Sequence, residues 1–114
     1  MVTLDDVASG ISNLRNQRFL RARSALRRIT TMLIRRYHVK KIILIGSLAD
    51  KDHFGFHSDI DLCVEGLPDK LYFKAVGDLL SAADEFDVDI IPIENAARSM
   101  RGKIEKGKVL YEKR

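Results

Sequence analysis

An apolar run near the middle of the chain predicts a buried strand that leads into a tight turn. Residues 41–45 read Lys-Ile-Ile-Leu-Ile, a run rich in β-branched side chains, and Gly46 and Ser47 follow it directly. Glycine is typical of such a turn because it tolerates backbone conformations that other residues avoid. A short helix is expected to begin at Ser47 and to run to about Lys51.

Alternation of polar and apolar residues predicts a second strand over residues 59–64. A strand with this pattern carries Asp59, Asp61 and Cys63 on one face and three apolar side chains on the other. The turn at Gly46 and the two aspartates can lie close together only if this strand is the antiparallel neighbour of the first one. We therefore expect that pairing.

The second half of the chain is expected to supply two further strands. Residues 86–91 form an apolar and acidic run that Pro92 ends, with Asp87 and Asp89 on one face. Residues 108–111 are predicted to form a short edge strand.

Two helices are expected to flank the third strand. One covers residues 69–83 with Asp69 as its N-cap, and the other covers about 94–106. Their core-facing residues are expected to be Leu71, Ala75, Leu79 and Ala82 in the first, and Ala96, Ala97, Met100 and Ile104 in the second.

A long helix is predicted for the N-terminal segment, from about Leu4 to Tyr37, with Gly10 as a possible point of interruption. Apolar residues recur at three- and four-residue spacing and make a core-facing stripe. The stripe consists of Phe19, Ala22, Leu26, Ile29 and Leu33. Arg21, Arg28 and Arg35 fall on the opposite side, and we interpret them as a solvated face in preference to a docking surface for a partner or RNA. Aromatic residues do not interleave with these arginines, so a base-stacking platform is not indicated.

These elements predict an α/β fold in which a small mixed sheet packs with helices, among them the long N-terminal one. A chain of 114 residues is expected to form one domain. Within it, residues 1–40 would be a basic helical segment and residues 41–112 the core that carries the chemistry.

Charge is distributed unevenly along the chain. The net charge of +4 combines +8 over residues 1–41, −9 over residues 42–94 and +5 over residues 95–114. The basic flanks are suited to phosphates, a nucleic acid or an acidic partner. A single cysteine, the lack of a leader pattern and the lack of a long apolar run favour a cytoplasmic protein without a membrane anchor.

The acidic middle segment contains the candidate chemistry. Two carboxylates side by side at the start of a strand, Asp59 and Asp61, repel each other unless a cation lies between them, and oxygen ligands suit Mg²⁺. The turn at Gly46 and Ser47 offers backbone N–H groups and a hydroxyl to a phosphate. Together these groups indicate phosphoryl or nucleotidyl transfer. The alternative is that the aspartates only pair with Arg or Lys, although basic residues are scarce between positions 42 and 94.

The order Gly46-Ser47, a gap of eleven residues and Asp59-Ile60-Asp61 resembles the signature of the nucleotidyltransferase superfamily related to DNA polymerase β. The small size of the chain and its C-terminal residues resemble the minimal nucleotidyltransferase (MNT) branch. The resemblance spans roughly residues 40–112 and implies a polymerase β-like nucleotidyltransferase fold.

The resemblance also implies roles for individual residues. It makes Asp59 and Asp61 catalytic ligands of Mg²⁺, with a third carboxylate from the next strand, preferably Asp89 and otherwise Asp87. It makes Gly46 and Ser47 the nucleotide-binding residues. Many relatives carry an Arg two or three places after the Ser; here Leu48, Ala49 and Asp50 follow, and Lys51 is the possible substitute.

Many members of the MNT branch act with a HEPN-domain toxin as a toxin–antitoxin pair. The resemblance therefore implies transfer of AMP from ATP to a hydroxyl, expected to be a tyrosine of such a toxin, in a type VII-like antitoxin. The alternative is a non-catalytic antitoxin with a vestigial site. Homo- or hetero-oligomers are compatible with both interpretations, and nucleic acid is a less favoured partner.

Overall fold

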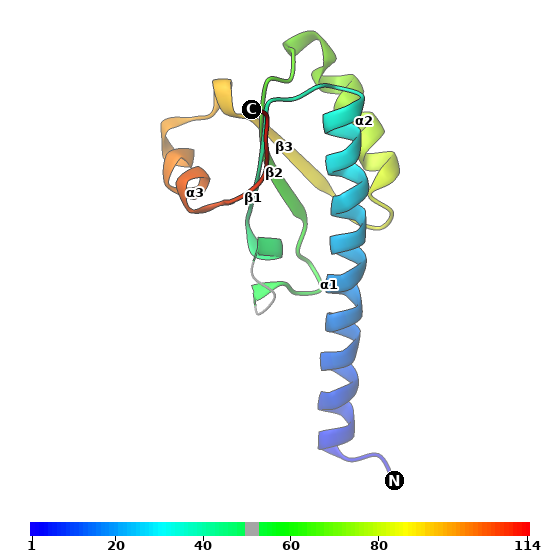
Figure 1. The fold of residues 1–114 in the computed structure, drawn as a ribbon. Coiled ribbons are helices and arrows are strands. Elements are labelled where there is room, and N and C mark those ends of the chain that lie inside the picture. The colour runs from blue at the N-terminus through cyan, green and yellow to red at the C-terminus, as the bar shows by residue number, and fades with distance from the viewer. Residues whose placement is uncertain (50–52) are drawn as a thin grey trace.

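The computed structural model describes residues 1–49 and 53–114 and consists of a four-stranded sheet with helices on both faces (Figure 1). The strands are β1 (Lys41–Ile45), β2 (Ile60–Glu65), β3 (Val88–Pro92) and β4 (Lys108–Glu112). Their order across the sheet is β3-β2-β1-β4. Strand β1 is antiparallel to both β2 and β4, and β2 is parallel to β3. The expected mixed sheet and the antiparallel pairing of the first two strands are thus confirmed.

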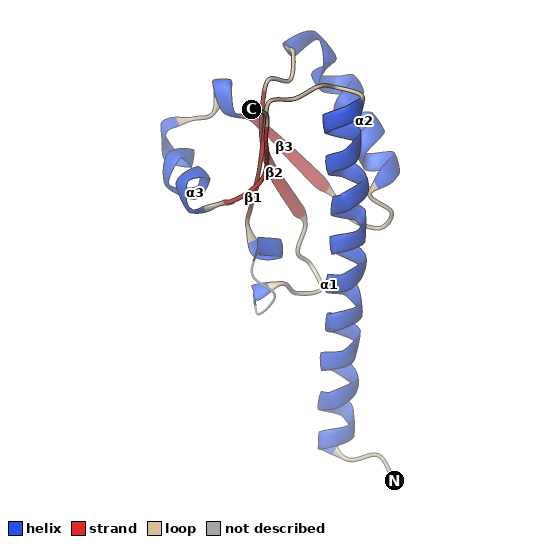
Figure 2. Ribbon diagram, viewed as in Figure 1, coloured by secondary structure: helices blue, strands red, loops and turns tan. Residues whose placement is uncertain are grey.

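Helix α1 (Leu4–Arg35) is one continuous helix (Figure 2). It begins with a capping box in which the Thr3 hydroxyl accepts from the Asp6 backbone N–H and the Asp6 carboxylate accepts from the Thr3 N–H. The helix passes through Gly10 without interruption, so the possible break there does not occur. Its last residue is Arg35, two positions before the predicted end.

The main core lies between one face of the sheet and the helices α1 and α2 (Tyr72–Ala82). The predicted stripe of α1 is buried here, except that Phe19 is only partly buried. The N-terminal part of α1 instead extends beyond the sheet (Figure 1). Its apolar side chains Leu4, Val7, Ile11 and Leu14 are exposed.

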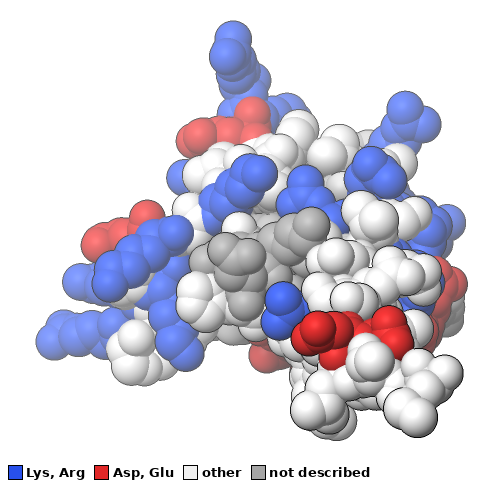
Figure 3. Space-filling model, turned by 90° about the horizontal axis from the view of Figure 1, so that it is seen from below, with Lys and Arg blue, Asp and Glu red and all other residues white. Residues whose placement is uncertain are grey.

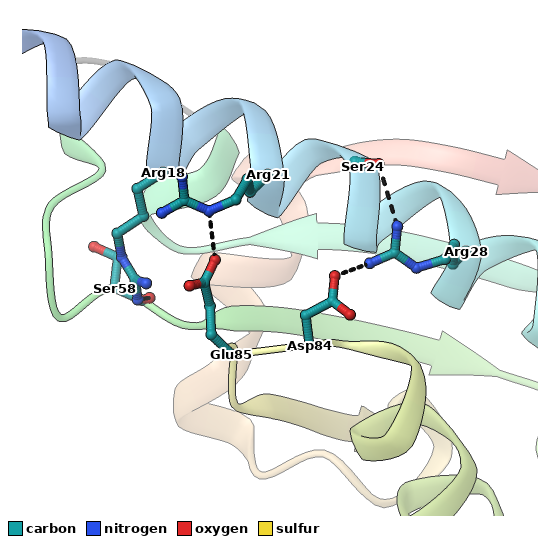
Figure 4. Close-up of polar contacts among 7 residues, drawn as sticks. All are labelled: Arg18, Arg21, Ser24, Arg28, Ser58, Asp84 and Glu85. Carbon is teal, nitrogen blue, oxygen red and sulfur yellow. Dashed lines mark hydrogen bonds and ion pairs between the residues drawn. The ribbon is translucent and has the colours of Figure 1, made fainter.

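Arginines on α1 attach the helix to the segment between α2 and β3 (Figure 4). Arg21 pairs with Glu85 at 2.7 Å, and Arg28 pairs with Asp84. Arg18 lies 4.5 Å from the ring centroid of Phe86 and donates to the Ser58 carbonyl. The expected solvated arginine face is confirmed, because Arg21, Arg28 and Arg35 are exposed; Arg21 and Arg28 in addition form ion pairs within the fold.

The predicted start of α2 is wrong. Asp69 is not the N-cap of α2; it lies in a 3₁₀ turn (Asp69–Leu71), and the helix starts at Tyr72 without a side-chain cap. The Asp69 carboxylate instead accepts a hydrogen bond from the Asn95 side chain at 3.5 Å. Of the expected stripe of α2, Ala75 and Leu79 are buried; the remaining two members, Leu71 and Ala82, are half-buried.

The predicted helix over residues 94–106 is confirmed only from Arg101 to Lys106. The segment forms two 3₁₀ turns, Ile93–Asn95 and Arg98–Met100, followed by the short helix α3 (Arg101–Lys106). Extended backbone at Ala96 and Ala97 separates the turns. Within the described ranges 1–49 and 53–114, no helix is both long and apolar enough to cross a membrane.

Candidate active site

The turn after β1 brings the backbone of Gly46 against the carboxylate of Asp61, which lies on β2. Gly46 has φ +78°, in the left-handed region that favours glycine, and a 3₁₀ turn (Ser47–Ala49) follows. A Cβ at Gly46 would lie 2.7 Å from Oδ2 of Asp61, too close for any other residue without displacement. Leu48 is buried and anchors the turn. Lys51, the expected nucleotide-binding lysine, lies outside the described residues.

Strand register places two of the predicted carboxylates beside each other. Asp61 pairs with Ile45 of β1 on one side and with Asp89 of β3 on the other. Asp59 comes directly before β2, and Asp87 comes directly before β3 because that strand starts at Val88 and not at residue 86. Asp59, Asp61 and Asp89 therefore gather at the sheet end where β1 turns at Gly46.

Burial and neighbouring charges act on Asp61. Burial raises the pKa of Asp61 above its ordinary value, the charges of Asp89 and Asp59 raise it further, and Lys103 lowers it. The pKa of the Cys63 thiol is raised by burial first and then by the charges of Asp61 and Asp89. None of the ion pairs found among residues 1–49 and 53–114 involves the three aspartates, which argues against the alternative that they merely neutralise Arg or Lys.

The donor set fits a hard divalent cation, because it consists of carboxylate oxygens that repel one another. Asp59, Asp61 and Asp89 would hold such an ion. In the part of the chain that the structure describes, however, no three acidic, His or Cys side chains are already gathered tightly enough to form a metal centre.

A hollow of about 350 Å³ opens beside this turn. Its lining includes Gly46 and Asp61 together with Lys103 and Lys106 of α3. Sequence analysis did not identify these two lysines; the only signal was the net charge of +5 over residues 95–114. A hollow of about 470 Å³ over α1 is lined by arginines, Thr31 and Met32 and contains none of the predicted site residues.

The chain matches a family model described as polymerase β nucleotidyltransferase over residues 27–114. No curated protein matches it.

Three solved structures of toxin–antitoxin complexes share the fold. One is a structure of a toxin–antitoxin with AMP-PNP. It is 25% identical, the match covers 76% of this chain and 73% of the chain in that structure, and the TM-score is 0.62. A second, of a mutant MntA toxin–antitoxin, is 25% identical over 77% of this chain and 72% of that chain, with a TM-score of 0.59. A third is a structure of the MntA–HepT toxin–antitoxin. It is 23% identical, the match covers 77% of this chain and 69% of the other chain, and the TM-score is 0.55. This likeness supports only the fold.

Proposed function

The chain belongs to the polymerase β nucleotidyltransferase family, and from this premise we propose that it is an antitoxin that transfers AMP from ATP to a tyrosine hydroxyl of a HEPN-domain toxin. The expected family and the polymerase β-like fold are confirmed by the family match over residues 27–114 and by the fold shared with toxin–antitoxin structures. The nucleotide, the acceptor and the site residues are the proposal, with the chain acting as a single nucleotidyltransferase domain.

One observation supports the proposal above the others. Asp61 and Asp89 are paired in register, and Gly46 packs so close to Asp61 that a Cβ there would displace the carboxylate. The glycine turn and the paired carboxylates therefore meet at one point, which is the arrangement that transfer at a phosphate needs. A relative of 25% identity that was solved with AMP-PNP supports ATP as the nucleotide.

In the proposed reaction, the backbone N–H groups after Gly46 and the Ser47 hydroxyl bind the β- and γ-phosphates. Asp59 and Asp61, with Asp89, would hold Mg²⁺, which supplies positive charge to the phosphates when bound. The tyrosine oxygen bonds to the α-phosphorus while the bond from that phosphorus to the α,β-bridging oxygen breaks. The phenolic proton goes to the carboxylate of Asp89, and pyrophosphate leaves.

The transfer step is tested by incubating the chain with labelled ATP, Mg²⁺ and a co-purified HEPN-domain toxin. We expect label on the toxin, and a loss of at least about a hundredfold in rate for Asp89→Asn, since a proton acceptor and a charge are removed together. Asp87→Asn is the matched control, because it changes the same residue type two positions earlier, before β3 begins. Equal rates for the two variants would contradict the role given to Asp89.

A second candidate is an antitoxin that acts by binding alone. It is favoured by the observation that, as far as the described residues go, the carboxylates do not already form a tight metal-binding group. The same experiment separates the two candidates. A toxin that is bound and inhibited without receiving label, by wild type and Asp89→Asn alike, would establish the binding-only function.

A further inference from the structure

Helix α3 is fixed against the end of β1. Ile104 and the preceding Met100 pack on a small cluster formed by Ile43, Ile45 and Cys63, on the sheet face opposite α1 and α2. Gly107 follows the helix directly, and a Cβ there would lie 2.5 Å from Cγ2 of Ile43. Only glycine permits this approach, so the C-terminal end of α3 has little freedom to move relative to β1.

The chain after α3 strengthens this attachment. Strand β4 begins at Lys108, which pairs with Leu44 of β1 two residues before Gly46. Strand β1 therefore carries the turn at Gly46 at its end and holds α3 beside that end.

This attachment places two lysines at the same hollow as the turn. Lys103 and Lys106 line the same hollow of about 350 Å³ as Gly46 and Asp61. Neither lysine takes part in the ion pairs found among residues 1–49 and 53–114, so no such pair holds these ammonium groups away from a ligand.

The hollow needs a cation if it is to take a polyphosphate. Residues 42–94 have a net charge of −9, and the three aspartates lie at this end of the sheet. Leu48 and Ala49 follow Ser47, and neither can carry charge. Lys and Arg side chains nevertheless lie on several sides of the face toward which α1 projects (Figure 3). Among the described residues, the positive charge that lines the hollow comes from another element, α3.

We propose that Lys103, assisted by Lys106, binds the β- and γ-phosphates of the nucleotide from the α3 side, opposite the Gly46–Ser47 turn. This inference rests on the proposed function in one respect, that the hollow receives a nucleoside triphosphate. The lysines hold the two phosphates that leave as pyrophosphate, and the turn and α3 form the two walls of one polyphosphate site.

Calorimetric titration with Mg²⁺–ATP, AMP and inorganic tripolyphosphate tests the inference. Lys103→Gln should weaken Mg²⁺–ATP and tripolyphosphate about tenfold or more, because a charge-assisted contact is lost, and should leave AMP within about twofold. Lys103→Arg should restore most of the affinity. Lys70→Gln is the matched control, because it removes the same charge from the 3₁₀ turn beyond the other end of β2. Melting temperatures of all variants should equal that of the wild type, since Lys103 is exposed.

The outcomes separate this inference from the proposed function. Equal Mg²⁺–ATP affinity in Lys103→Gln and Lys70→Gln would overturn the inference, whatever the chain does to a toxin. A parallel loss of ATP and AMP binding would also overturn it, because the effect would not concern the β- and γ-phosphates. A third outcome is that Lys103→Gln selectively loses ATP and tripolyphosphate binding while the wild-type chain labels no toxin. That outcome would support the inference and contradict the proposed transfer.

Discussion

Asp61 is a residue at which the fold and the proposed chemistry have opposite requirements. Burial and the charges of Asp89 and Asp59 raise its pKa above the ordinary value of 3.8, so the folded protein binds a proton there more tightly than the unfolded chain does. The protonated Asp61 therefore contributes to the stability of the folded state at pH values below 3.8. This contribution is lost as the pH rises through the higher folded-state pKa, and at neutral pH the charged carboxylate disfavours the folded state.

Replacing Asp61 with Asn tests this interpretation. The change removes the charge and keeps nearly the same shape, so without metal the variant should melt at the same or a higher temperature than wild type at pH 7. The difference should shrink as the pH falls through the raised folded-state pKa of Asp61, because the wild-type carboxyl then takes up a proton. Thermal unfolding in chelator at several pH values measures both effects, and nucleotidyl transfer should be abolished in the same protein. A large fall in melting temperature at pH 7 would instead identify Asp61 as a partner of a buried cation.

Local sequence pattern could predict some site residues but not others. Asp59 and Asp61 followed from alternation along one strand, and Gly46 followed from the abrupt end of an apolar run. The choice between Asp89 and Asp87 depends on the parallel register of β2 and β3, which pairs Asp61 with Asp89. Lys103 could not be placed from sequence, because its position beside Asp61 depends on how α3 packs against β1.

Among the secondary-structure elements, predictions succeeded where the pattern of apolar residues was compatible with only one kind of element. The predicted span of β1 matches residue for residue, and the edge strand was misplaced by a single residue at its end. The helix prediction for residues 94–106 failed at its N-terminal part. Apolar residues there recur at helical spacing, but the contacts made by the first turn favour a different backbone. The Glu94 carboxylate accepts from the backbone N–H of Gly66 at 2.8 Å, and this turn is followed by extended backbone.

Helix α1 offers a matched test of what burial contributes. Leu26 is 4% exposed in the core, whereas Leu14 is 56% exposed on the part of the same helix that extends beyond the sheet. Leu26→Ala should lower the free energy of unfolding by ~2–5 kcal/mol, because it leaves a cavity. Leu14→Ala should change it by less than ~0.5 kcal/mol. Urea unfolding measures both, and a loss below ~1 kcal/mol for Leu26→Ala would show that α1 is not a core element.

Across the whole molecule, the fold collects charges that are separated along the sequence. The acidic segment 42–94 supplies β2 and β3, and the basic segments on either side supply α1 and α3. Part of the positive charge of α1 and of its C-cap is engaged, since Arg21, Arg28 and the capping Arg36 pair with carboxylates on or after α2. The positive charge of α3 lies beside the carboxylates at the end of β2. The balance of charge at the candidate site is therefore a property of the assembled sheet and not of any one segment.

This balance predicts that ATP binds well only together with a divalent cation. Lys103 and Lys106 line the hollow, but Asp61 lines it too, and Asp59 and Asp89 lie at the same end of the sheet, so we expect a bare triphosphate to meet net repulsion. A hard cation between the carboxylates and the phosphates removes that repulsion. Calorimetry should therefore give at least about tenfold tighter ATP binding with Mg²⁺ than with chelator, a difference of ~1.4 kcal/mol. The double variant Asp59→Asn, Asp61→Asn serves as the control: without the two charges, bare ATP should bind better than it does to wild type, and Mg²⁺ should add little. Equal ATP affinity of the wild-type chain with and without Mg²⁺ would mean that the carboxylates do not face the triphosphate.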